Sequence, residues 1–139
     1  MRKPLFMLAA GAAAILSMTG ATAADRSTRA QDRAAKDAAE FQKAVAGLTP
    51  GKPMSCLPLS RQSLAMKGIG SKLVYRASRK LMYVNDAPGC EGVARGDTLV
   101  TRQYTGRSCR GDIAQTVDRI ARFPTGSCAL GDFVPYRAN

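Results

Sequence analysis

The stretch LVYRASRKLMYV, residues 73–84, decides the fold that we expect for this chain. Its two apolar runs, residues 73–76 and 81–84, contain the aromatic and β-branched residues that favour strands. They flank the polar tetrad ASRK at residues 77–80, which is typical of a four-residue hairpin loop. The stretch therefore predicts an antiparallel hairpin within a domain made mainly of β-strands.

Short apolar runs separated by turn residues continue this pattern on both sides of the hairpin. We expect further strands at residues 55–59, 98–104 and 128–136. Residues 112–123 fit either a helix or a strand, and we favour a strand because the surrounding spacing is strand-like. These intervals predict a small antiparallel β barrel or sandwich.

Residues 28–47 have instead the period of an amphipathic helix. Apolar residues recur there at intervals of three and four, and the face that they form contains Ala34, Ala38, Phe41, Val45 and Leu48. The first half of this face has only alanine, so we expect the helix to dock mainly through its last three apolar residues. The sequence thus predicts one N-terminal α-helix before the β domain.

The first 23 residues have the layout of a secretory signal peptide. Two basic residues precede an apolar run at residues 5–18, and Ala21-Thr22-Ala23 supplies a cleavage site. The apolar run is shorter than the roughly 20 residues of a transmembrane helix. We expect cleavage after Ala23, a chain that does not span the membrane once cleaved, and a periplasmic or secreted location; an uncleaved anchor is the alternative. The remainder would divide into a helix and linker at 24–51 and a disulfide-stabilised β domain at 52–139.

The chain has four cysteines, at Cys56, Cys90, Cys109 and Cys128, and no histidine. Exported proteins meet an oxidising compartment, so we expect these cysteines to form two disulfides. Of the three possible pairings we prefer Cys56 with Cys128, which would join the first and last expected strands, and Cys90 with Cys109. The chain lacks the Cys-x-x-Cys motif of zinc sites and redox dithiols, so we expect no metal and no cofactor.

A Gly-Asp pair follows each of the last three cysteines and contributes Asp97, Asp112 and Asp132. We interpret these pairs as turns, because glycine accepts a positive φ and aspartate hydrogen-bonds the turn backbone. The alternative is an enzyme in which the three aspartates converge for acid–base chemistry. Because the absence of histidine excludes triads and dyads with an imidazole base, we expect a non-enzymatic protein.

The β domain carries a large surplus of positive charge. From Lys52 onward there are 14 Lys and Arg against 6 Asp and Glu, a difference of 14 − 6 = 8. The candidate anion-binding residues flank expected strands and tyrosines: they are Arg76, Arg79, Lys80, Arg102, Arg107 and Arg110. Outside the cytoplasm we expect anionic lipid, lipopolysaccharide or acidic glycan as partners and no nucleic acid. The alternatives are a solvated surface without a ligand and an inhibitor of an exported hydrolase.

The chain from residue 50 onward contains an ordered set of short motifs. They are PGKP at 50–53, CLP at 56–58, YVN at 83–85, GC at 89–90, CRGD at 109–112, GSC at 126–128 and FVPY at 133–136. This set, which covers roughly the last two thirds of the chain, resembles a family of small, uncharacterised exported proteins of proteobacteria. The resemblance implies a Gram-negative envelope setting and a compact β domain, and it transfers no catalytic residues.

Overall fold

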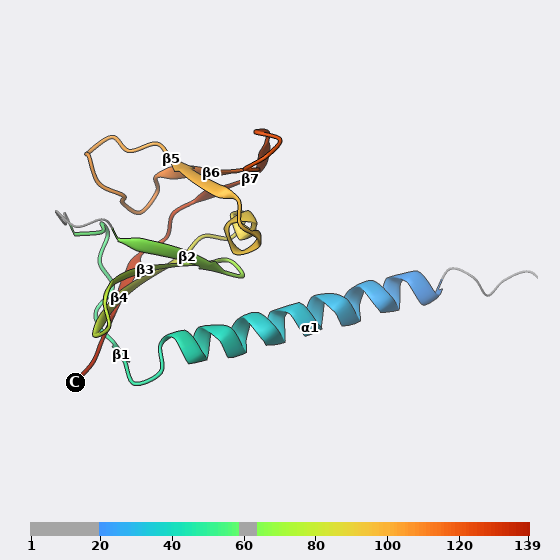
Figure 1. Ribbon diagram of the computed structural model, residues 1–139, viewed down its shortest axis with the longest axis horizontal. Coiled ribbons are helices and arrows are strands. Elements are labelled where there is room, and N and C mark those ends of the chain that lie inside the picture. The colour runs from blue at the N-terminus through green and yellow to red at the C-terminus, as the bar shows by residue number, and fades with distance from the viewer. Residues whose placement is uncertain (1–19, 59–63) are drawn as a thin grey trace, which may run out of the picture. The chain divides into compact units, whose positions relative to one another are not determined.

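The computed structural model describes residues 20–58 and 64–139, with side chains from residue 24 onward. The chain divides into two compact units, residues 1–33 and 34–139, and the second unit contains all the strands (Figure 1). In chain order the elements are α1 (Gly20–Ala44), β1 (Thr49–Pro50), β2 (Ala65–Ile69), β3 (Lys72–Ser78), β4 (Leu81–Asp86), the 3-10 helix η1 (Glu91–Arg95), β5 (Thr98–Thr101), β6 (Ile113–Val117), β7 (Pro124–Ala129) and β8 (Phe133–Arg137).

The helix α1 begins at Gly20, earlier than the predicted residue 28, because the preceding alanine-rich stretch also favours a helix. It ends at Ala44 and is followed by Gly47 at a φ of 74°, which agrees with a glycine stop signal. Val45 is buried, and Phe41 and Leu48 pack against the same apolar cluster. The predicted docking through these three residues is therefore confirmed.

The predicted hairpin at 73–84 is confirmed as β3 and β4, with a shorter loop than expected. Ser78 pairs with Leu81, so the loop contains only Arg79 and Lys80. The Ser78 hydroxyl accepts a hydrogen bond from the Lys80 backbone N–H, which closes this tight turn. The hairpin lies in a five-stranded antiparallel sheet with the order β1-β8-β4-β3-β2.

The strand β2 was not predicted, because Lys67 and Gly68 lower its apparent strand propensity. Gly68 is needed here for a close approach to η1: a Cβ at this position would collide with the backbone at Val93 and Ala94. The expected strand at 55–59 is also different. Cys56 makes an isolated bridge, as does Met54 two residues before it, and residue 59 lies outside the described residues.

The second sheet has three antiparallel strands in the order β5-β6-β7. The strand β6 confirms the preference for a strand within 112–123, and β5 is shorter than the expected 98–104. The single strand predicted at 128–136 is wrong. Residues 130–132 belong to neither strand and separate the end of β7 from β8; the backbone N–H groups of Leu130 and Gly131 donate to the carbonyls of Asp112 and Asp86.

The two sheets form separate layers around one core (Figure 1). The larger sheet contributes Leu73, Tyr75, Tyr83 and Phe133 to this core, and the smaller sheet contributes Ala114 and Cys128. On its other face the larger sheet packs Val74, Met82 and Val84 against the end of α1. The expected mainly β fold with an N-terminal helix is therefore confirmed in its open, two-sheet form, with no closed barrel among the described residues.

Candidate functional site

The disulfides join Cys56 with Cys109 and Cys90 with Cys128. The pairing that we preferred from the sequence is therefore wrong. It assumed that Cys128 ends near the first strand, whereas the register of β7 on β6 places Cys128 opposite Ala114, on the face that packs against Cys90. Cys56 instead forms a backbone bridge with Cys109. All four cysteines are in disulfides, as expected.

The disulfide Cys90–Cys128 lies in the core, and glycines let its two chain segments touch. A Cβ at Gly89 would collide with the carbonyl oxygen of Ser127, and a Cβ at Gly126 would collide with that of Gly89. Gly89 also has a φ of 99°, which side chains rarely adopt. The glycines of the motifs GC and GSC thus allow two backbone segments to approach closely.

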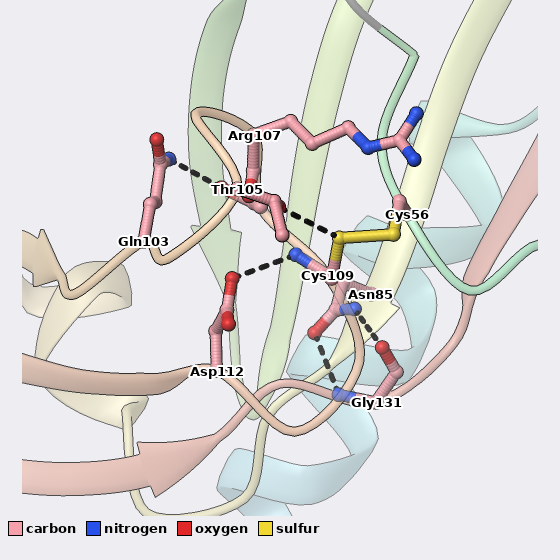
Figure 2. The surroundings of a disulfide bond; sticks show 9 residues. Cys56, Asn85, Gln103, Thr105, Arg107, Cys109, Asp112 and Gly131 are labelled. Carbon is pink, nitrogen blue, oxygen red and sulfur yellow. Dashed lines mark hydrogen bonds between the residues drawn. A yellow bond between two sulfur atoms is a disulfide. The ribbon is translucent and has the colours of Figure 1, made fainter.

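The disulfide Cys56–Cys109 lies at one end of the loop that follows β5 (Figure 2). The Cys109 backbone N–H donates to the Asp112 carboxylate at 2.8 Å, and the Thr105 hydroxyl lies 3.6 Å from the Cys109 sulfur. The Gln103 side chain donates to the Ser108 hydroxyl at 2.9 Å. Short-range hydrogen bonds and the disulfide together therefore shape this loop.

The three candidate aspartates each have a local structural partner. The Thr125 hydroxyl donates to Asp97, Asp112 accepts from the Cys109 backbone, and Asp132 pairs with Arg110 at 3.3 Å. In the described part of the chain, no group of three or more Cys, Asp or Glu side chains is placed to hold a metal ion. The convergence that an enzyme of this kind requires is therefore not present. The turn interpretation is confirmed for Gly111-Asp112, whereas Asp97 and Asp132 interact with side chains and Gly131 lacks a positive φ.

The structure divides the six candidate cations into two groups, and all six side chains are exposed. The hairpin cluster contains Arg76, Arg79 and Lys80, which lie on β3 and in the β3–β4 loop. The loop cluster contains Arg102, Arg107 and Arg110, which lie between β5 and β6. Arg110 pairs with Asp132, and the other five take part in none of the ion pairs formed within the described residues.

Three further cations were not identified as candidates from the sequence. Arg137 lies opposite Leu81 on β4, and the Ala138 N–H donates to the Lys80 carbonyl, so Arg137 adjoins the hairpin cluster. The position of Arg137 next to the hairpin follows from the pairing of β8 with β4 and could not be predicted from the sequence. Arg119 and Arg122 lie in the β6–β7 turn, at one end of the smaller sheet.

A hollow of about 470 Å³ lies between the end of α1 and the strands β2 and β3. Its walls include apolar residues and the cations Lys43, Lys67 and Arg76. Glu40 forms a salt bridge with Lys67 and so compensates part of this charge. The hollow is cationic at its rim, like the surface around it.

Three ionisable groups have shifted pKa values. Burial beside Phe133, whose ring centroid lies 5.9 Å away, raises the pKa of Tyr75 to about 12. The backbone N–H of Gly89 lowers the pKa of Glu91, and those of Ala121 and Ile120 lower the pKa of Asp118. Each shift moves the group away from neutral pH, in contrast to the shift that general acid–base catalysis requires.

Comparison with known proteins found no matching family model, no matching curated protein and no matching solved structure. Within residues 20–58 and 64–139, no helix combines the length and the apolar character needed to cross a membrane.

Proposed function

We propose that this protein is exported and binds anionic components of the cell envelope through its basic surface, without catalysing a reaction. One observation carries the proposal: five of the six candidate cations are exposed and lie outside the ion pairs of the described chain. A guanidinium group without an internal partner is free to make charge-assisted, often bidentate hydrogen bonds with phosphate or carboxylate.

Cations from two neighbouring strands lie at the hairpin end of the larger sheet. Arg79 and Lys80 form the whole β3–β4 loop, and Arg137 comes from the adjacent strand β8. Hydrogen bonds fix the backbone of the loop and of Ala138, which follows Arg137. These cations therefore project from an ordered backbone. Several cations that act together bind a polyanion more strongly than isolated ones do.

The compartment proposed here agrees with the covalent structure. The two disulfides are of the kind that persists in an oxidising environment. Phosphate-bearing lipids, lipopolysaccharide and acidic glycans are the polyanions that the surplus of positive charge would meet there.

Direct binding measurements test the proposal. The processed protein recovered from the periplasm would be mixed with lipopolysaccharide, anionic lipid vesicles or an acidic glycan, at about 10 mM and at about 150 mM salt. We expect binding at low salt that weakens strongly at high salt, because added ions screen exposed charges. Absence of binding to all three at low salt would contradict the proposal.

Charge reversal separates a specific patch from general attraction. Arg79→Glu with Lys80→Glu should weaken binding at least tenfold, because it reverses the hairpin cluster. The matched control is Arg26→Glu with Arg33→Glu on the exposed side of α1, which changes the net charge by the same amount. Equal losses in both double variants would show that net charge alone governs binding.

A further inference from the structure

Exposed apolar side chains gather in one segment of the molecule. Six large hydrophobic side chains are exposed in the described chain, and five of them lie between residues 100 and 123: Val100, Tyr104, Ile113, Ile120 and Phe123. Only Met66 lies elsewhere. Contiguous apolar patches on a protein surface often mark contacts with other molecules.

The outer face of the smaller sheet carries no charge. Its three strands, TLVT, IAQTV and PTGSCA, contain no charged residue. Ala114, Thr116 and Cys128 are buried toward the core, whereas Ile113 and Gln115, which alternate with them along β6, are exposed. In contrast, the strand β3 in the larger sheet contains Lys72 and Arg76. The smaller sheet therefore presents a neutral outer face.

The β6–β7 turn lies at one end of the smaller sheet and holds its apolar residues in an ordered backbone. The Asp118 carboxylate accepts hydrogen bonds from the backbone N–H groups of Ile120 and Ala121, at 2.8 and 2.7 Å. The Asp118 N–H donates to the Phe123 carbonyl, and the Arg122 N–H donates to the Asp118 carbonyl. Ile120 is nevertheless 94 % exposed, and Phe123 is 55 % exposed. The turn therefore presents two apolar side chains to the surroundings.

Cations surround the neutral face. Arg119 and Arg122 lie in the turn at one end, and Arg102 and Arg107 lie in the loop at the other. The two acidic residues between β5 and the end of β7 are Asp112 and Asp118, and backbone N–H groups bind both carboxylates. The unpaired charge around this face is therefore positive.

We propose that the outer face of the smaller sheet binds the surface of an anionic phospholipid bilayer, with Ile120 and Phe123 inserted among the headgroups. Arg102, Arg107, Arg119 and Arg122 lie in this arrangement against lipid phosphates. The inference rests on the proposed anion-binding function and names its partner. A glycan would match the cations but would offer nothing to two exposed apolar side chains, whereas a bilayer matches both.

The absence of tryptophan from the chain gives a direct test. Ile120→Trp places a single reporter at the tip of the turn, and the protein is mixed with vesicles of phosphatidylglycerol and phosphatidylcholine. We expect the emission to shift to shorter wavelength and to be quenched by lipids with brominated acyl chains. The matched control is Gln42→Trp, which places an exposed reporter on α1, on the opposite side of the larger sheet from the smaller sheet, where we expect neither effect.

A second pair of variants measures the contribution of the apolar side chains. Ile120→Ser with Phe123→Ser should weaken binding to these vesicles at least tenfold, while Met66→Ser should leave it unchanged. Both variants alter exposed side chains, so the thermal midpoint of unfolding should stay close to that of the original protein. All proteins are prepared with the same N-terminal residue, so the contribution of the N-terminus to vesicle binding is the same in every variant.

The outcomes separate this inference from the proposed function. Salt-sensitive vesicle binding without a wavelength shift, retained in the double serine variant, would overturn the inserted face and leave anion binding intact. Absence of binding to vesicles, lipopolysaccharide and acidic glycan would overturn both. A shift that occurs without vesicles, together with a dimer in sedimentation, would show that a second copy covers the face and would also overturn the inference.

Discussion

Cys90 and Cys128 are 1 % and 6 % exposed and lie in the core between the two sheets, whereas Cys56 and Cys109 are half-buried and join two segments outside the regular strands. The chain-entropy model gives each disulfide about 4 kcal/mol, because the sequence separations of 38 and 53 residues differ little on a logarithmic scale. By loop entropy alone, the surface disulfide Cys56–Cys109 would contribute slightly more to stability than the core disulfide Cys90–Cys128. Burial therefore decides the difference that we expect: the core disulfide supports the whole fold, and the surface disulfide constrains the loop with Arg102 and Arg107.

Removal of the core disulfide should have the largest effect. Cys90→Ala with Cys128→Ala loses the cross-link and leaves space in the core, at a cost of about 5 kcal/mol or more. That cost is comparable with the whole stability of a small domain, so we expect a largely unfolded protein at 25 °C. Circular dichroism and urea titration measure the result, and a stable native fold would contradict the account.

Removal of the surface disulfide should be milder. For Cys56→Ala with Cys109→Ala we expect a folded protein whose free energy of unfolding is about 2–4 kcal/mol lower, because little packing is lost. Hydrogen exchange should become faster in residues 102–111 and should change least in β3 and β4. If this variant unfolds while the core double variant remains folded, the comparison is reversed.

One glycine beside each disulfide allows a matched substitution. Gly89→Ala and Gly111→Ala both place a side chain at positive φ, 99° and 87°, but only the former collides with a neighbour, the Ser127 carbonyl. We expect a loss of about 2–4 kcal/mol for Gly89→Ala and about 1 kcal/mol for Gly111→Ala. Urea titration checks both values, and equal losses would show that backbone strain alone matters.

The core and the surface should also respond differently to alkaline pH. Burial raises the pKa of Tyr75 from 10.0 to about 12, so ionisation favours the unfolded chain. Below pH 10 this contribution to stability is fully present, and between pH 10 and 12 it falls by about 1.4 kcal/mol per pH unit. Tyr75→Phe should reduce this dependence, as unfolding titrations at several pH values would show. The same slope in both proteins would contradict the assignment.

The smallest effect should come from the surface ion pair. Asp132→Asn removes the charge that faces Arg110, and both side chains are substantially exposed. We expect a loss below about 1 kcal/mol, because solvent and salt screen exposed pairs. Chemical unfolding at low and high salt measures it. A larger loss would mean that this pair supports the surface disulfide more than its exposure suggests.

Local patterns were enough to predict much of the fold. The apolar period of residues 41–48 identified the docking face of α1, and the runs at 73–76 and 81–84 identified the central hairpin. The run at 128–136 misled because Leu130 is apolar and buried although it lies between two strands. Hydrophobicity reports burial, and here a buried connection had the same pattern as a strand.

Features that depend on register could not be predicted in the same way. The cysteine pairing follows from the placement of β7 on β6, and the position of Arg137 next to the hairpin follows from the pairing of β8 with β4. Neither leaves a signal within a short window of sequence. The candidate cations were identifiable by residue type, but their division into two groups required the fold.

The central claim is that a protected core disulfide and an accessible surface disulfide join these particular cysteines. Graded reduction of the native protein, thiol labelling and tryptic peptide mapping test it directly, because lysine or arginine separates all four cysteines in the sequence. We predict bridged peptides for Cys56–Cys109 and Cys90–Cys128, with Cys56 and Cys109 labelled first while the native circular dichroism remains. A bridge between Cys56 and Cys128, or earlier labelling of Cys90 and Cys128, would contradict the account.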